Sequence, residues 1–147
     1  ETTFNTFLGG DAYRSDSLKS FTEGTTNVLL AMKCLDEGVD VPRAEIGIFA
    51  SSTGNPRQFI QRRGRLLRKH PAKNFARIYD MIVVPNYTSI SGEKDVFKIE
   101  RSLVKTELTR VAYFASLAEN YSESYNELKS ICDHYKLSID ILINELK

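Results

Sequence analysis

Apolar residues gather in four short runs within the first half of the chain. The runs are 4–8 (FNTFL), 28–32 (VLLAM), 46–50 (IGIFA) and 78–84 (IYDMIVV). The last three are mostly unbroken rather than alternating with polar residues, which is typical of strands buried on both faces of a parallel sheet. The pattern therefore predicts four strands, three of them buried on both sides.

Helical spacing occupies the intervals between these runs. Arg14, Leu18 and Phe21 share one face of a helix predicted over about residues 14–22, and a second helix is predicted over about 56–69. Strands that alternate with helices predict an open α/β sheet with right-handed crossovers. In such sheets ligands usually bind in the loops at the carboxyl ends of the strands.

The pattern changes after Pro85. Residues 86–95 are polar and turn-rich, and no strand-like run follows them. The apolar residues that support one long amphipathic helix are Val96, Leu103, Val104, Val111, Phe114 and Leu117. We therefore expect a sheet domain over residues 1–92 and a helical extension over residues 93–147.

Two capping signals predict further helices in this extension. The sequence SYNE at 124–127 has the form of a capping box, in which a serine and a glutamate satisfy the first free N–H groups of a helix. Ser138 stands before the apolar stretch IDILINEL and is expected to cap a last helix.

Composition narrows the class of protein. At 147 residues with 41% hydrophobic residues, the chain is long enough for one packed core. No apolar run approaches the roughly 20 residues that a membrane span needs. Cys34 and Cys132 indicate reduced, buried thiols and no zinc site, so we expect a cytoplasmic protein. Because the chain begins with Glu1 and has no leader pattern, we expect it to be part of a longer polypeptide.

Positive charge is concentrated in one stretch. From Arg57 to Arg77 there are eight Lys and Arg residues and no acidic residue, although the whole chain carries a net charge of only +1. All other residues together therefore carry a net charge of −7. This asymmetry is typical of a phosphate-facing patch on an acidic body.

The chemistry of this stretch depends on its helical spacing. On a helix, Gln61, Arg65 and Arg68 lie within about 60° of one another, while apolar residues cover the opposite side. Arginine binds phosphate oxygens in a planar, bidentate way and keeps its charge. A solvated basic face would show the same run of charge. Two features favour a ligand instead: acids are absent, and Gly64 lets a backbone or ligand approach.

Two segments resemble motifs of a known family. QRRGRLLR (61–68) resembles motif VI of superfamily 2 helicases and translocases, and LLAMKCLDEGVDVP (29–42) resembles their motif V. RSDSLKSF (14–21) is similar to the segment that precedes motif V, so the resemblance covers residues 9–85. It implies the second RecA-like domain of a nucleic-acid-dependent ATPase, an α/β fold with a mostly parallel sheet flanked by helices.

In this family ATP with Mg²⁺ is held mainly by the first RecA-like domain. Its glycine-rich loop and acidic magnesium motif do not occur in these residues. The resemblance therefore implies that the N-terminal RecA-like domain of the same polypeptide is a partner. It also implies that these residues alone do not hydrolyse ATP.

The resemblance assigns roles to individual residues. Arg65 and Arg68 match the arginine fingers that reach the γ-phosphate, and Gln61 matches the polar residue that links the nucleotide to the cleft. Gly38 and Asp40 match motif V, with the aspartate placed near the ribose or near the motif VI arginines.

The resemblance also suggests which nucleic acid is bound. Lys33 matches a position that touches nucleic-acid backbone, and we expect Arg62 to do the same. A motif VI that starts with glutamine and ends in LLR is more similar to DNA-acting translocases of repair and restriction systems than to DEAD-box RNA helicases. Double-stranded DNA is therefore the expected partner, together with possible restriction or repair proteins.

Arg63 departs from the family pattern, which more often has an apolar residue at this position. On the predicted helix it lies on the core-facing side. A buried, unpaired arginine would be costly, so we expect Arg63 either to pair with an acid such as Asp40 or Glu37 or to reach the surface.

Two other functions remain open from the sequence. The chain could be a non-catalytic nucleic-acid-binding or docking module that retains the helicase fold, which would not need Gln61, Arg65 and Arg68. It could also be a nucleotide-binding regulatory domain, which would show no salt-sensitive DNA binding.

Overall fold

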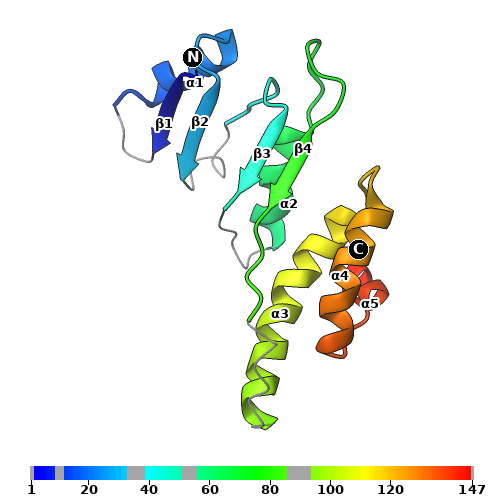
Figure 1. Ribbon diagram of the computed structural model, residues 1–147. Helices are drawn as coiled ribbons and strands as arrows, with labels where there is room; N and C mark the ends of the chain where they lie inside the picture. The colour runs from blue at the N-terminus through cyan, green and yellow to red at the C-terminus, as the bar shows by residue number, and fades with distance from the viewer. Residues whose placement is uncertain (1, 9–11, 33–38, 51–55, 86–93, 147) are drawn as a thin grey trace. The chain divides into compact units, whose positions relative to one another are not determined.

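The computed structural model of the protein describes residues 2–8, 12–32, 39–50, 56–85 and 94–146. The chain divides into two compact units (Figure 1). The first, here the α/β unit, holds residues 1–48 and 60–79, and the second, here the helical unit, holds residues 49–59 and 80–147. Each unit is described by itself.

The α/β unit begins with a strand, a helix and a second strand. They are β1 (Phe4–Leu8), α1 (Arg14–Glu23) and β2 (Val28–Met32). The two strands pair in parallel, with a register that runs from Phe4 opposite Val28 to Leu8 opposite Met32 (Figure 1). The bounds of both predicted strands are confirmed, and α1 is one residue longer than expected.

The carboxyl end of α1 is closed by a glycine and an arginine. Gly24 adopts a left-handed conformation with φ of 85°, which glycine tolerates because it has no Cβ. Its N–H donates to the Phe21 carbonyl at 3.2 Å. Arg43 donates to the same carbonyl from Nη1 at 2.8 Å, so the end of α1 is tied to the segment that follows β2.

A second strand–helix–strand segment follows. It comprises β3 (Ile46–Phe49), α2 (Pro56–Leu66) and β4 (Arg77–Asp80), and β3 pairs with β4. The Arg77 N–H donates to the Glu45 carbonyl at 2.7 Å and the Met81 N–H donates to the Phe49 carbonyl at 3.0 Å. Residue numbers rise together along both strands, so this pair is also parallel, as the arrows in Figure 1 show. β4 is shorter than the predicted strand 78–84.

The prediction that three strands are buried on both faces is wrong for β2, and alternate side chains of β3 and β4 are exposed as well. Successive side chains of a strand point to opposite faces, and the register places Phe4, Leu30 and Met32 on the face opposite Phe7. Phe7 is 1% exposed, whereas Phe4, Leu30 and Met32 are 65%, 50% and 63% exposed. The described residues therefore cover one face of this strand pair, the face against which α1 packs.

Three helices dominate the helical unit. They are α3 (Lys94–Ala115), α4 (Tyr121–His134) and α5 (Ile139–Asn144), with α4 running back beside α3 (Figure 1). Their apolar faces meet in one buried cluster: Val104, Leu108, Ala112, Leu128, Cys132, Tyr135, Ile139, Leu142 and Ile143. The prediction of a long amphipathic helix followed by two shorter ones is confirmed.

The start of α4 differs from the prediction. The helix begins at Tyr121 with Asn120 before it, so the expected capping box at 124–127 lies inside the helix. Asn120 and Glu123 have the same spacing as that box, and the Asn120 amide donates to the Glu123 carboxylate at 3.3 Å. The earlier start adds Tyr121 to the helix, where its ring packs edge-on against Tyr125 at 5.8 Å between centroids. Burial of that extra aromatic ring favours the longer helix.

The thiol of Cys132 is buried in the helical core and makes no disulfide, as expected. Burial raises the pKa of this thiol, and the neighbouring Asp133 carboxylate adds to the shift. Cys34 lies outside the described residues. Ser138 directly precedes α5, as predicted, although its side chain makes no capping hydrogen bond. No helix in the described ranges is long and apolar enough to cross a bilayer.

Candidate functional site

The basic stretch forms α2 and the turn that follows it. α2 ends at Leu66, so Arg68 lies beyond the helix, and the predicted end at residue 69 is wrong. Two local causes end the helix here. Pro71 disfavours helical conformation at the preceding residue, His70. The Leu66 carbonyl accepts a hydrogen bond from the side chain of Lys73 at 2.6 Å instead of from a following helical N–H.

The structure brings three predicted site residues together. Arg65 donates from Nη1 to the main-chain carbonyl of Val39, and Arg68 forms an ion pair with the carboxylate of Asp40. Of the two positions considered for Asp40, near a ribose or near the basic stretch, the structure shows the second. Two guanidinium groups therefore lie side by side against one short segment, residues 39–40.

The contact between Arg68 and Asp40 can be exchanged at little cost. The side chains are 58% and 39% exposed, and ion pairs in such surroundings contribute only about 0–1 kcal/mol. Among the described residues, the second carboxylate oxygen of Asp40 is shielded from solvent and accepts no hydrogen bond. Asp40 therefore holds Arg68 weakly and keeps one acceptor unused.

The other predicted site residues on α2 are accessible to different degrees. Gln61 is exposed and Arg62 is half-buried. A Cβ built on Gly64 would meet nothing within 4 Å, so the space beside it is open. Lys33 and Gly38 lie outside the described residues.

Arg63 is buried, and its side chain is 0% exposed. The expectation that it might reach the surface is therefore wrong. The Asp40 oxygen nearest the basic stretch already binds Arg68, and Glu37 lies outside the described residues. Arg63 thus contributes to the interior and is not available to a ligand.

Lys73 is a residue of this site that the sequence did not indicate. Its Nζ donates to the carbonyl of Leu66 at 2.6 Å and to the carbonyl of Ala44 at 3.0 Å. Burial lowers the pKa of Lys73, while the carboxylates of Glu45 and Asp40 act in the opposite direction. Ala44 is 29 residues away in the chain, so no local pattern could have shown this contact.

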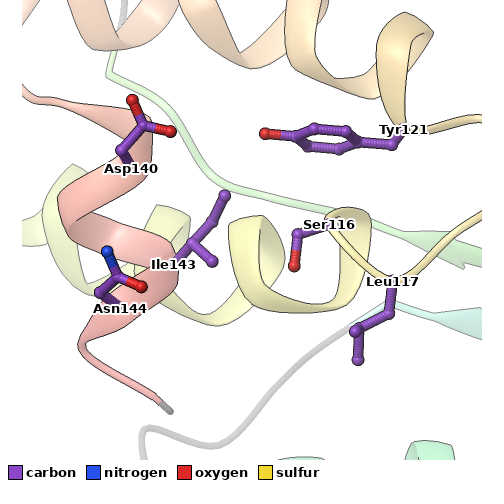
Figure 2. A pocket seen from close by; sticks show the side chains of 6 residues that line it. All are labelled: Ser116, Leu117, Tyr121, Asp140, Ile143 and Asn144. Carbon is purple, nitrogen blue, oxygen red and sulfur yellow. The ribbon is translucent and has the colours of Figure 1, made fainter.

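The helical unit has a hollow of its own, of about 320 Å³. Figure 2 shows it between the end of α3, the start of α4 and α5. The residues that line it are Ser116, Leu117, Tyr121, Asp140, Ile143 and Asn144. The lining contains an acid and no basic side chain, so it offers no positive charge to a phosphate.

Phosphate is the ligand class that suits the end of α2. Arg65 and Arg68 supply planar donors there, and each currently donates to an oxygen atom that a phosphate oxygen could replace. Within the described ranges, no three His, Cys, Asp or Glu side chains gather closely enough to hold a metal ion. Arg65 and Arg68 fit an anionic ligand.

Residues 10–70 match the family model of the helicase conserved C-terminal domain. This stretch is therefore similar to the C-terminal domain of helicases. The match includes the segment of Val39 and Asp40 and all of α2, so the arginine cluster lies within the matched stretch. The α/β fold and the C-terminal helical extension agree with the fold predicted for such a domain.

Individual relatives support the same family. The chain is 46% identical over 56 residues to a DNA 3'-5' translocase XPB2 of Sulfurisphaera tokodaii, a stretch that covers 38% of this chain and 13% of that protein. It is 37% identical over 60 residues to the ATP-dependent DNA helicase MPH1 of Scheffersomyces stipitis, covering 41% and 6%. It is 47% identical over 51 residues to a Dicer-like protein 2 of Cryphonectria parasitica, covering 35% and 4%.

The matched stretch thus corresponds to a small part of each relative. It spans 4% to 13% of the lengths of these three relatives. No solved structure matches the chain. The activity of the whole protein is therefore a matter for proposal.

Proposed function

We propose that this chain forms the second RecA-like half of a nucleic-acid-dependent ATPase. Residues 1–92 would form the RecA-like domain and residues 93–147 its helical extension. The single observation that carries the proposal is the pairing of Arg65 and Arg68 with the segment of Val39 and Asp40. In this arrangement both guanidiniums lie at one end of α2 and are bound to oxygen atoms through exchangeable contacts.

Arg65 and Arg68 act as arginine fingers toward ATP bound on the first RecA-like domain of the same polypeptide. Each arginine exchanges its present oxygen partner for an oxygen of the γ-phosphate when the two domains close. Because Arg68 gives up an exposed ion pair worth about 0–1 kcal/mol, the exchange needs little free energy. A guanidinium that contacts the transferring phosphoryl group stabilises the charge that develops in the transition state.

Closure of the two domains is favoured only while the γ-phosphate is present. The two arginines supply a differential interaction between the closed and open states, and loss of the γ-phosphate removes it. Asp40 and the Val39 carbonyl then take the guanidiniums back. The segment at 39–40 thus gives the arginines a defined position in the open state.

Gln61, Gly38 and the unused oxygen of Asp40 belong to the nucleotide-facing side in this proposal. Gln61 is exposed on the helix that carries Arg65. The unused Asp40 oxygen is shielded from solvent in the present arrangement, so it would accept from a hydroxyl group, such as one of a ribose, only once this segment rearranges on closure. The magnesium ion that accompanies ATP would be held by the first domain.

Double-stranded DNA is the proposed nucleic acid. The names of two relatives, a DNA translocase and a DNA helicase, support DNA. Lys33 and Arg62 are the proposed backbone contacts, because cations that touch phosphates bind without reading base sequence. Binding of this kind weakens steeply as salt concentration rises.

The testing experiment is ATP hydrolysis by the intact parent polypeptide, with and without duplex DNA. Arg68→Ala should lower DNA-stimulated turnover by about 10³-fold or more, and Arg65→Ala should act in the same direction. ATP binding should change much less, because the fingers act mainly in the transition state. The matched control is Lys69→Ala, which removes one positive charge from the exposed residue next to Arg68.

The outcomes separate the proposed motor from the alternatives. Turnover that collapses in both arginine variants but not in the Lys69 variant supports the finger assignment. Unchanged turnover in Arg68→Ala would remove it. Salt-sensitive DNA binding without any turnover, surviving both substitutions, would identify a binding module instead, and a matching RNA duplex in the same assay tests the choice of DNA.

A further inference from the structure

We infer that Lys73 is a positioning residue that holds the end of α2, and therefore Arg65 and Arg68, in register with the segment at 39–44. The inference rests on the function proposed above for the two arginines. It assigns a role to a lysine in the turn after α2, beyond the end of the motif VI segment at 61–68.

The contacts of Lys73 are with main-chain atoms on both sides of the site. Its Nζ donates to the carbonyl of Leu66, the last residue of α2, at 2.6 Å. The same Nζ donates to the carbonyl of Ala44 at 3.0 Å. One ammonium group thus joins the end of the arginine-bearing helix to the segment that leads into β3.

The end of a helix is a suitable place for this cation. The last carbonyls of a helix have no partner within the helix, and the helix dipole places partial negative charge there. Lys73 satisfies one of these carbonyls and complements that charge. The main chain beside Arg65 and Arg68 is therefore fixed by a bond that does not involve the arginines themselves.

The segment on the other side of Lys73 carries the present partners of the arginines. Val39 and Asp40 lie four to five residues before Ala44, and the Ala44 N–H donates back to the Val41 carbonyl at 3.0 Å in a local turn. Lys73, Ala44, Asp40 and Arg68 thus close a ring of contacts around the end of α2. The lysine sets the distance across this ring.

The origin of the lysine side chain is itself held in place. The Lys73 N–H donates to the His70 carbonyl at 3.0 Å, and the Ala72 N–H donates to His70 Nδ1 at 3.2 Å. The charged groups that face the ammonium are Glu45 and Asp40. Partial burial of a lysine is unfavourable for its charged form. The presence of Lys73 in this turn despite that cost is consistent with a positioning role.

Lys73 keeps its partners when the arginines change theirs. Movement of Arg65 and Arg68 to a γ-phosphate releases the Val39 carbonyl and Asp40, whereas the Leu66 and Ala44 carbonyls stay bonded to Lys73. The lysine should therefore matter most when the fingers are engaged. A misplacement of about 1 Å at that stage can lower the rate of the chemical step by about 10²-fold.

The experiment compares three substitutions in the intact polypeptide with duplex DNA present. Lys73→Met keeps the length of the side chain and removes its donors, Lys73→Arg keeps the charge and the donors, and Lys69→Met removes a charge from an exposed lysine four residues earlier. We expect Lys73→Met to lower kcat by about 10- to 100-fold with KM for ATP changed by less than about 3-fold. Lys73→Arg should recover most of the loss, and Lys69→Met should behave as wild type.

A combined variant separates positioning from a general loss of structure. If Lys73 acts through the two fingers, adding Lys73→Met to a variant that lacks both, Arg65→Ala with Arg68→Ala, should lower turnover no further. Losses that multiply would overturn the inference, as would a Lys73→Met enzyme with wild-type kcat. Should Lys73→Met unfold at the assay temperature, Lys73→Gln keeps one donor, and an intermediate kcat at constant KM is then expected, with wild-type kcat again overturning the inference.

The same variants also distinguish a failure of this inference from a failure of the proposed function. If Arg68→Ala collapses turnover while Lys73→Met matches Lys69→Met, the function stands and the role of Lys73 is wrong. If the wild-type polypeptide shows no ATP turnover with DNA, the proposed function fails and this role of Lys73 fails with it.

Discussion

Different interactions stabilise the interior of the α/β unit and the interior of the helical unit. In the helical unit, α3, α4 and α5 share one apolar cluster that includes Val104, Leu108 and Leu142, each 2% exposed or less. In the α/β unit, several apolar strand side chains are at least half exposed, among them Leu30 and Met32. Apolar packing therefore contributes more to the stability of the helical unit than to that of the α/β unit, which holds the candidate site.

In the α/β unit, hydrogen bonds from long polar side chains provide part of the stabilisation. Arg43 binds the end of α1, Lys73 binds the end of α2, and Arg65 binds the Val39 carbonyl. Each of these contacts joins a helix to a distant segment of main chain. Such contacts are directional, and the exposed ion pair of Arg68 with Asp40 can be exchanged at little cost.

The difference suggests a division of roles. In the proposed function the arginines are released and recaptured, and a site of this kind cannot be locked into a dense core, because cores move between discrete packings rather than gradually. Regions that rearrange during function are usually drawn from the less stable parts of a protein. The comparison predicts that substitutions in the two units will differ in how much they lower the free energy of unfolding and in how many elements they affect.

The largest effect is expected from Leu108→Ala in α3. Leu108 is 0% exposed within the helical cluster, so the change should lower the free energy of unfolding by about 2–5 kcal/mol. Leu103→Ala is the matched control, because Leu103 lies on the same helix and is 59% exposed, and it should cost less than about 0.5 kcal/mol. Urea unfolding of the 147-residue chain, followed by circular dichroism, measures both.

Hydrogen exchange of the Leu108 variant tests the comparison directly. Protection should fall along α3, α4 and α5, while the amides of β1, α1 and β2 should exchange at their original rates. Equal loss of protection in β1 and β2 would mean that the two units unfold as one, and the comparison would be wrong.

A smaller effect is expected from Gly24→Ala in the α/β unit. Gly24 has φ of 85°, and a Cβ there would lie 2.5 Å from Nη2 of Arg43. The substitution should lower the free energy of unfolding by about 1–3 kcal/mol, through backbone strain and displacement of the Arg43 side chain. Arg43 is a flexible side chain, which keeps the expected loss below that of Leu108→Ala.

Gly64→Ala is the matched control for that prediction. Gly64 lies within α2, and a Cβ there would meet nothing within 4 Å. Alanine is the better helix former by about 1 kcal/mol, so this change should leave stability unchanged or raise it. Thermal unfolding that ranks the two variants in the opposite order would show that the clamp made by Arg43 is unimportant.

The sequence was informative wherever structure depends on neighbouring residues. The strands at 4–8 and 28–32 and the start of α2 follow from local apolar runs and from Pro56. The end of α2 does not follow from the local sequence, because it is set partly by the side chain of Lys73, a residue beyond the helix. The partners that define the site are likewise distant, with Arg68 bound to Asp40 28 residues earlier.

Two differences from the predictions have the same physical origin. Arg63 was expected either to pair with an acid or to reach the surface, and it does not reach the surface because its burial depends on packing around α2 that no periodicity describes. The first turn of α4 was missed because Asn120 and Ser124 begin equivalent capping patterns, and packing of Tyr121 decides between them. The local sequence is compatible with more than one local structure, and tertiary contacts determine which one forms.

The smallest effect concerns an exposed charge pair that adds to the packing of the helical unit. The Glu145 carboxylate accepts hydrogen bonds from Lys105 at 2.7 Å and from Thr109 at 3.3 Å, and the Lys105 contact is the main cause that lowers the pKa of Glu145. Because the folded-state pKa is depressed, the pair stabilises the fold above the unfolded-state pKa, near 4.5. That contribution is lost as pH falls through the folded-state pKa.

Lys105→Met should therefore lower the thermal unfolding midpoint slightly at about pH 7, and the difference from wild type should vanish at pH values below the folded-state pKa of Glu145. In a Glu145→Gln background the same substitution should show no such pH dependence, because the carboxyl group is gone. A difference that grew as pH fell would contradict the direction of the pKa shift. A loss as large as that of Leu108→Ala would break the comparison itself, since a polar contact would then stabilise the helical unit as strongly as its core.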